Sequence, residues 1–183
     1  MYGIVKLYEK IASKITLLEK IYIKLCSKMI KNEILGTEIT PADKILHIGC
    51  GSIPYTALLI TNATKTPVTA IDNDPDAIRN AKILIKKTGK NYPLVTLQCA
   101  DGNDIAVSDF DVIFVSNSVK PKKIILERII SSMKEGARLV YRNPIKIFGL
   151  SYDYETVIVK GGKSMKHIKH SFLVLRESII FEK

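Results

Sequence analysis

Two glycines and an aspartate in the first half of the chain have the types and spacing of a nucleoside-binding site. Gly49 and Gly51 follow the apolar run 44–48, and a segment of small and apolar residues, 52–60, comes next. Glycine lets the backbone turn sharply and approach a ligand closely, and the helix expected after the turn would point its N-terminus at that ligand. Asp72 ends a second apolar run, 21 positions after Gly51. At about that spacing a carboxylate reaches ribose hydroxyls.

Other polar residues fall where later apolar runs end. Asp101-Gly102 come after one such run, Ser116-Asn117 after a second, and Arg142 closes a third. In an open α/β sheet the carboxyl ends of parallel strands line the crevice in which ligands bind. We therefore expect these residues to gather with the glycine turn along one edge of a sheet.

The positioning elements alternate between strand and helix after Pro41. Expected parallel strands cover 44–49, 68–72, 94–99, 111–115 and 138–142, and expected helices begin near Pro54, Pro75 and Pro121. Two further runs, 156–159 and 172–181, are joined by a short polar link, 160–170, which is too short for a crossover helix, so they must pair as an antiparallel hairpin. The sequence predicts an α/β domain over 41–183, with five parallel strands and a C-terminal hairpin.

The N-terminal 40 residues form a separate helical segment. Apolar residues from Ile4 to Met29 recur at alternating steps of four and three, which predicts a helix over 4–35. Gly36 lies where a helix C-cap is expected, and Pro41 prevents an easy continuation. Three readings stay open: packing on the domain's own sheet, a lid over the ligand cleft, and a helix that forms a homodimer.

The bulk composition is that of a globular protein without a membrane span. The chain has 183 residues, of which 46% are hydrophobic and 25% charged, and no apolar run approaches the ~20 residues that cross a bilayer. The charged N-terminal segment lacks the pattern of a signal peptide. We expect a cytoplasmic location and no membrane partner. Three widely separated cysteines, with no pair at zinc-ligand spacing, indicate neither a metal site nor a disulfide framework.

The net charge of +10 raises the question of a nucleic-acid partner. Lysines recur every third residue in the polar link, with two histidines among them, a pattern suited to phosphate contacts. These are Lys160, Lys163, Lys166, Lys169, His167 and His170. The basic residues are otherwise spread along the chain, which favours ordinary solvated surfaces, so a small-molecule partner is preferred over nucleic acid.

These motifs and their order resemble the Rossmann-like fold of class I S-adenosylmethionine-dependent methyltransferases, over residues 41–183. The resemblance implies S-adenosylmethionine as the cofactor, with Asp72 on the ribose hydroxyls and Asp101-Gly102 at the adenine amino group. Ser116-Asn117 would stand at the substrate-facing end of the fourth strand. The cofactor-binding residues implied are Gly49, Cys50, Gly51, Ser52, Pro54, Asp72, Asn73, Asp101, Gly102 and Ser116.

Within that superfamily the chain is similar to nicotianamine synthases. The run from Gly49 to Ala57, the segments 72–77 and 110–115, and the segment 136–142 carry the likeness. Those enzymes transfer the aminocarboxypropyl arm of the cofactor instead of its methyl group. They also carry a substantial helical N-terminal domain, whereas only about 40 residues precede the sheet here.

The candidate catalytic residues are Tyr55, Asn117 and Arg142. Tyr55 begins the helix that faces the glycine turn, or else packs under the N-terminal helix. Arg142 can hold a substrate carboxylate with two hydrogen bonds, or else forms a surface ion pair. His47 stands where many methyltransferases have an acidic residue, but its apolar neighbours favour a buried neutral histidine with a local hydrogen bond.

The function predicted from these observations is S-adenosylmethionine-dependent methyl transfer to a small molecule. Two alternatives are kept. One is aminocarboxypropyl transfer, as in nicotianamine synthases. The other is RNA modification, with the basic hairpin as the binding surface.

Overall fold

A computed structural model describes residues 16–88, 92–144, 164–170 and 176–183 of the chain. The helices are α2 (Thr16–Thr37), α3 (Tyr55–Thr64), α4 (Pro75–Lys87) and α5 (Lys122–Ser132). The strands are β1 (Ile45–Ile48), β2 (Val68–Asp72), β3 (Val95–Cys99), β4 (Val112–Val115), β5 (Arg138–Pro144), β6 (Ser164–Lys169) and β7 (Arg176–Glu182).

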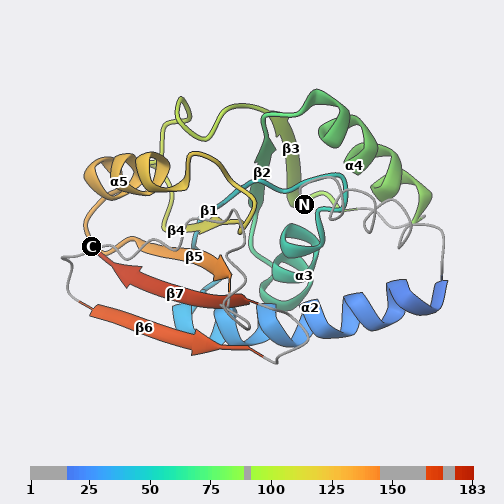
Figure 1. Cartoon of the computed structure of the whole chain (residues 1–183), viewed down its shortest axis with the longest axis horizontal. Helices are drawn as coiled ribbons and strands as arrows, with labels where there is room; N and C mark the ends of the chain where they lie inside the picture. The colour runs from blue at the N-terminus through green and yellow to red at the C-terminus, as the bar shows by residue number, and fades with distance from the viewer. Residues whose placement is uncertain (1–15, 89–91, 145–163, 171–175) are drawn as a thin grey trace.

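The strands form one sheet in the order β3-β2-β1-β4-β5-β7-β6 (Figure 1). Strands β1 to β5 are parallel, and β7 pairs antiparallel with β5 and with β6. Every residue of β1 and β4 is buried, as expected for parallel strands covered on both faces. The chain order reverses between β1 and β4, and the crevice at such a reversal is where α/β sheets bind ligands. The predicted α/β fold is confirmed.

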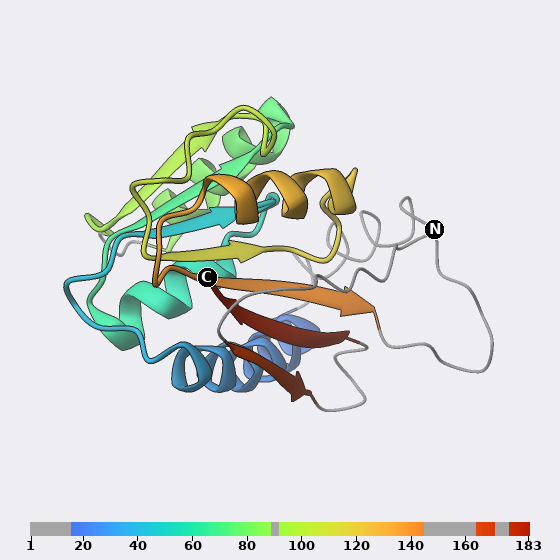
Figure 2. The ribbon, with the colours of Figure 1, turned by 90° about the vertical axis from the view of Figure 1, so that its left-hand side faces the viewer.

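Helices cover both faces of the sheet. One apolar layer joins residues of α2, α3 and α4 to the sheet, and it includes Ile30, Ala57 and Ile78. The other layer packs Ile125, Leu126 and neighbouring residues of α5 against the opposite face. Figure 2 shows α5 on one side of the sheet and α2 on the other. The sheet therefore lies between two helical layers.

The C-terminal hairpin forms, but not from the residues expected. Strand β6 is Ser164–Lys169, inside the stretch predicted as a polar link, and the predicted strand 156–159 lies outside the described residues. Met165 and Lys166 are exposed, whereas Ile168 packs against the α2 layer. A strand at a sheet edge buries little of its surface, so its polar composition hides it from a hydrophobic pattern. The predicted link is wrong for this reason.

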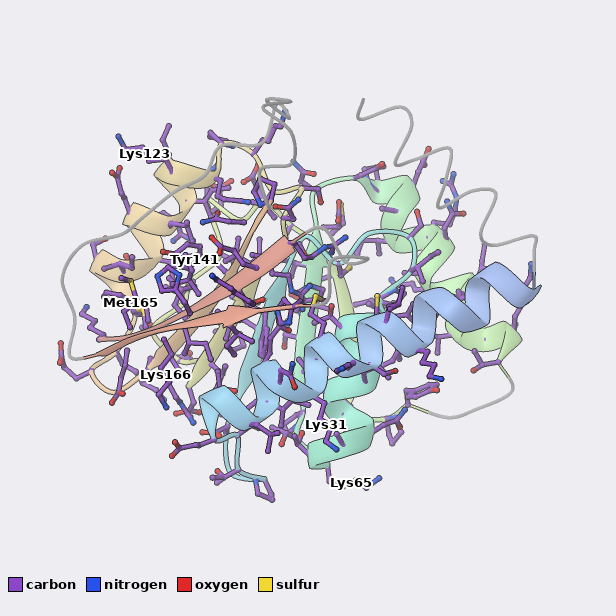
Figure 3. All side chains as sticks on the ribbon, turned by 60° about the horizontal axis from the view of Figure 1, so that its bottom comes forward. Lys31, Lys65, Lys123, Tyr141, Met165 and Lys166 are labelled. Atoms are coloured by element: carbon purple, nitrogen blue, oxygen red, sulfur yellow. The ribbon has the colours of Figure 1, made fainter. Side chains whose placement is uncertain are left out.

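The helix α2 runs across α3 and the hairpin strands (Figure 3). Its described part thus packs on the domain's own sheet, whereas residues 4–15 of the predicted helix lie outside the described part. The predicted cap is wrong: α2 continues to Thr37, and Glu38, with φ of 53°, takes the left-handed conformation after the helix. Gly36 serves close packing, because a Cβ there would lie 2.5 Å from Ile180 Cδ1.

Candidate active site at the carboxyl edge of the sheet

The glycine turn after β1 has the conformation that its residues predict. Gly49 and Gly51 adopt positive φ angles of 79° and 66°, which residues with side chains rarely adopt. A Cβ on Gly49 would lie 2.6 Å from Val119 Cγ2, whereas a Cβ on Gly51 would meet nothing within 4 Å. The backbone N–H groups of Gly49 and Cys50 both donate to the Ile71 carbonyl at 2.9 Å. The turn is therefore anchored to β2 on one side and open at Gly51 on the other.

Asp72 ties this turn to the start of α4. Its Oδ2 accepts from the Gly51 N–H at 2.8 Å, and its Oδ1 accepts from the Asp74 N–H at 3.1 Å. Asp74 in turn caps α4 through the Asp76 N–H, with Pro75 at the first helical position. A carboxylate has about four lone-pair positions, so Asp72 keeps acceptor capacity for a ligand while it shapes the loop.

The Asp101-Gly102 turn lies against the same edge. Asp101 Oδ1 accepts from the backbone N–H and the side-chain amide of Asn103, at 2.7 and 3.1 Å. A Cβ on Gly102 would lie 2.8 Å from Ile48 Cγ2. Only glycine lets this turn approach the end of β1 so closely, which brings the ends of β3 and β1 together.

Ser116 follows β4 and lies beside the glycine turn. Its N–H donates to the Ile48 carbonyl at 3.0 Å, and a Cβ on Gly49 would lie 3.3 Å from the Ser116 Cβ. The Ser116 hydroxyl is 2.9 Å from Nε2 of His47, which is 2% exposed. Burial, together with the positive charge of Arg142, lowers the pKa of His47 to about 3. The predicted buried neutral histidine with a local hydrogen bond is confirmed.

The neighbouring Asn117 is held by a buried lysine. Lys122, 2% exposed at the start of α5, donates from Nζ to Asn117 Oδ1 at 3.3 Å and to the Arg142 carbonyl at 2.7 Å. The ammonium group links the ends of β4 and β5. It also places a positive charge on the β4 side of the edge, opposite the Asp72 carboxylate on the β2 side.

Arg142 is engaged inside the protein. Its Nε and Nη2 donate to the two carboxylate oxygens of Glu33 in α2, both at 2.8 Å, and its Nη1 donates to Thr56 Oγ1 at 3.1 Å. Ser178 in β7 also donates to Glu33. Both charged side chains are buried, so the ion pair lies in the interior. The alternative predicted from the sequence, an ion pair at the surface, is wrong about this location. A contact with substrate stays a prediction.

Two buried groups have shifted pKa values that bear on this edge. Burial alone would raise the pKa of Glu33, but the charge of Arg142 and the hydrogen bonds from Arg142 and Ser178 hold that pKa below its ordinary value. Burial, and next the Asp72 carboxylate, raise the pKa of the Cys50 thiol to about 12. A thiol that stays protonated is a poor nucleophile, so Cys50 contributes shape to the turn.

The other residues predicted for the site lie in the same region. Pro54 is buried at the N-cap of α3, and Tyr55 begins that helix and is partly exposed. Ser52 is partly exposed within the turn, and Asn73, after Asp72, is exposed. These four positions lie in the segments that directly follow β1 and β2, and their contacts with a ligand stay predictions.

Glu33, Lys122 and Ser178 are not among the residues predicted from the sequence. Glu33 has apolar neighbours in α2. Helical periodicity alone predicts that a charged side chain of such a helix faces water. Lys122 lies one residue after Pro121 and looks like a surface helix residue. Ser178 falls within an apolar run. Alternation in β7 was a usable signal for Ser178 alone, since it places Ser178 on the same face as Ile180.

The basic residues of β6 are exposed. Lys166, His167 and Lys169 face solvent, and Lys166 lies 3.5 Å from the Glu38 carboxylate; Lys160 and Lys163 fall outside the described residues. A nucleic-acid partner and a homodimer through the N-terminal helix both stay predictions. In the described ranges no cluster of histidine, cysteine and acidic residues has metal-site geometry. None of the described helices has the length and apolar character to span a bilayer.

The sheet order, the glycine turn and the acidic strand ends define a class I S-adenosylmethionine-dependent methyltransferase fold. Solved structures have this fold in common with the chain. A point mutant of MtNAS in complex with S-adenosylmethionine aligns with a TM-score of 0.71 and 21% identity, over 85% of this chain and 60% of that one. An RNA methyltransferase from Salinibacter ruber, in complex with S-adenosyl-L-homocysteine, aligns with a TM-score of 0.59 and 14% identity over 85% of this chain and 90% of that one.

The family follows from the sequence match. The model of the nicotianamine synthase protein family matches residues 17–167, which is most of the chain, and the chain belongs to that family. The likeness to nicotianamine synthases predicted from the glycine loop is confirmed.

A curated relative matches a shorter stretch. The ribosomal protein L11 methyltransferase of Burkholderia ambifaria is 28% identical over 107 residues. The match covers 58% of this chain and about a third (34%) of that relative's length.

Proposed function

We propose that the chain is an S-adenosylmethionine-dependent transferase that acts on a small molecule and binds the cofactor at the carboxyl edge of β1, β2 and β4. The observation that carries this proposal is the turn at Gly49 and Gly51, whose open side a Cβ would fill and whose shape Asp72 fixes. Asp72 and Asp101 would hold the nucleoside part, and Ser116 would face the amino-acid part. When bound, S-adenosylmethionine supplies an electrophilic sulfonium centre, from which transfer of the aminocarboxypropyl arm leaves methylthioadenosine and transfer of the methyl group leaves S-adenosylhomocysteine.

The aminocarboxypropyl group is the one we favour for transfer. The family model that matches the chain is that of nicotianamine synthases, and MtNAS has also been solved in complex with MTA and tNA. A small-molecule amine is then the acceptor. Tyr55, the first residue of α3, would orient that amine through its hydroxyl, and Asn117, which Lys122 holds by a hydrogen bond, would contact the acceptor.

Methyl transfer to a small molecule is the second candidate. It is supported by the match to ribosomal protein L11 methyltransferases, which covers 58% of this chain. In either reaction positioning of the acceptor supplies much of the rate, so the fold alone does not discriminate between the two.

Two measurements test the proposal in sequence. Calorimetric titration with S-adenosylmethionine, S-adenosylhomocysteine and methylthioadenosine should show binding of at least one, weakened in Asp72→Ala. Mass spectrometry of reactions with a panel of small amines should then show methylthioadenosine accumulating with an acceptor that is heavier by one aminocarboxypropyl group. Accumulation of S-adenosylhomocysteine would establish methyl transfer instead, and absence of binding by all three ligands would overturn the proposal.

A further inference from the structure

We propose that His47 is a positioning residue that turns the Ser116 hydroxyl into a hydrogen-bond donor for the carboxylate of the cofactor. This rests on the proposed function, because it names a role at the same cofactor site. It is carried by the contact between His47 Nε2 and Ser116 Oγ and by the surroundings of the imidazole.

The sheet register sets the two residues side by side. His47 pairs with Phe114, and Ile48 pairs with Val115, so Ser116 is level with Gly49 and diagonal to His47. Diagonal neighbours on one face of a sheet are within reach of long side chains. The imidazole is buried and the hydroxyl is partly exposed. His47 thus supports from within the core a hydroxyl that borders the glycine turn.

The direction of this hydrogen bond follows from the other imidazole nitrogen. His47 Nδ1 is buried and has no hydrogen-bond partner in the part of the chain that the structure describes. A buried N–H group without an acceptor is rarer, and costs more free energy, than a buried unprotonated nitrogen without a donor. The neutral ring therefore carries its proton on Nε2 and donates to Ser116 Oγ, which leaves the serine proton to be donated elsewhere.

The charges at the edge select the ligand group. The β2 side carries the Asp72 carboxylate, whereas on the β4 side the Lys122 ammonium is bound to Asn117, the residue next to Ser116. An anionic group is stabilised on the side with the positive charge, and a hydroxyl that donates to a carboxylate forms a stronger bond than one to a neutral acceptor. The amino-acid carboxylate of the cofactor meets both conditions.

The decisive test compares a ligand that contains the amino-acid arm, with its carboxylate, and a ligand that lacks this arm. S-Adenosylhomocysteine contains it, and methylthioadenosine lacks the whole amino-acid arm. In calorimetric titrations we expect Ser116→Ala and His47→Phe each to weaken S-adenosylhomocysteine binding about ten- to a hundredfold, the range for a hydrogen bond to a charged group. Neither should change methylthioadenosine binding by more than about twofold. The double variant should bind S-adenosylhomocysteine no more weakly than the single variant that has the lower affinity for this ligand.

Controls separate this role from a loss of stability. Thr66→Val removes another buried hydroxyl, which donates to the Thr40 carbonyl at the opposite end of the sheet, and should leave both affinities unchanged. Ser116 is partly exposed, so its alanine variant should fold even if His47→Phe does not, and His47→Gln is the milder second variant. Nitrogen-15 NMR of the wild-type imidazole should show the proton of His47 on Nε2.

Specific results would overturn the inference. Equal weakening of the two ligands, additive effects of the two substitutions, or a proton on Nδ1 would each do so. If wild-type protein bound methylthioadenosine and S-adenosylhomocysteine but the variants showed no difference between them, only this role would fall. If wild-type protein bound neither ligand nor S-adenosylmethionine, the proposed function would fall and this role with it.

Discussion

Glu33 and Arg142 form a bidentate ion pair in the interior of the domain, with both N–O distances at 2.8 Å. The two residues are 109 positions apart in the chain. The pair joins α2 to β5 next to the first turn of α3, where Thr56 also binds the guanidinium. It therefore fixes the N-terminal helix against the edge that carries the candidate site.

The first prediction concerns the stability that depends on this pair. Glu33→Met or Arg142→Met should each lower the free energy of unfolding by about 3–5 kcal/mol, because each leaves a buried charge without its partner. The double variant Glu33→Met/Arg142→Met should lose less than the sum of the single losses. Urea unfolding measures all three. The exposed pair of Asp76 and Arg79 is the matched control, and Asp76→Ala should cost at most about 1 kcal/mol. Additive losses would show that the two side chains do not interact.

The second prediction is a pH dependence set by His47. Its pKa is about 3 in the folded protein, against an ordinary value of 6.5, so between these values the unfolded chain binds a proton that the folded protein excludes. The free energy of unfolding should therefore fall as the pH drops below about 6.5, by up to about 1.4 kcal/mol per pH unit. His47→Gln, which cannot titrate, should lack this component.

Urea unfolding of wild type and His47→Gln at several pH values between about 5 and 7.5 checks the sign. This window lies above the range in which Glu33 titrates, since the pKa of that carboxyl is held below its ordinary value of 4.5. The pKa of His170 is also lowered by burial, but its contribution is common to both proteins and cancels in the difference. Parallel curves for the two proteins would contradict the prediction.

The third prediction compares the two glycines of the turn. Alanine at Gly49 would place its Cβ against Val119, whereas alanine at Gly51 would point into open space. Gly49→Ala should therefore lower stability by about 1–3 kcal/mol, from overpacking together with the positive φ, and Gly51→Ala should cost less. Gly51→Ala should instead weaken S-adenosylhomocysteine binding, because the methyl group occupies the open side. Thermal unfolding and calorimetry, run on both variants, measure the two effects separately.

The fourth prediction concerns Asp72. Asp72→Ala removes the acceptor for the Gly51 and Asp74 N–H groups, so the loop loses its shape as well as a ligand contact. We expect S-adenosylhomocysteine binding to weaken at least tenfold, about 1.4 kcal/mol or more, measured by calorimetry. Asp72→Asn is the informative companion: its side-chain oxygen can still accept one N–H, so it should fall between wild type and Asp72→Ala. An unchanged affinity in both variants would remove Asp72 from the site.

Local pattern was sufficient for the central sheet and the turn. The apolar runs of β1, β2 and β4 are short and bounded by glycine, proline and acidic residues, and β2 begins and ends where predicted. The residue type of Gly49 and Gly51 alone indicates positive φ angles, because no other residue adopts such angles as readily. Asp72 could be assigned to the edge because strand ends and spacing are properties of the chain itself.

The hairpin and the end of α2 could not be predicted in the same way. Strand β6 is polar because it lies at the edge of the sheet. Local pattern predicts a cap at Gly36, whereas the glycine serves a contact with Ile180, 144 positions away in the chain. Periodicity reports which residues face a core. It does not report which other segment supplies that core.

The sequence by itself determined the class of fold and the loop that defines the candidate site, since both depend on short-range patterns of size, polarity and backbone freedom. Only the tertiary structure decided which polar groups are paired: Arg142 with Glu33 in the interior, Lys122 with Asn117 at the edge, and His47 with Ser116. Burial and the direction of a hydrogen bond depend on what surrounds a group in space. Residues far apart in the chain supply those surroundings, so no local pattern could have assigned the partners.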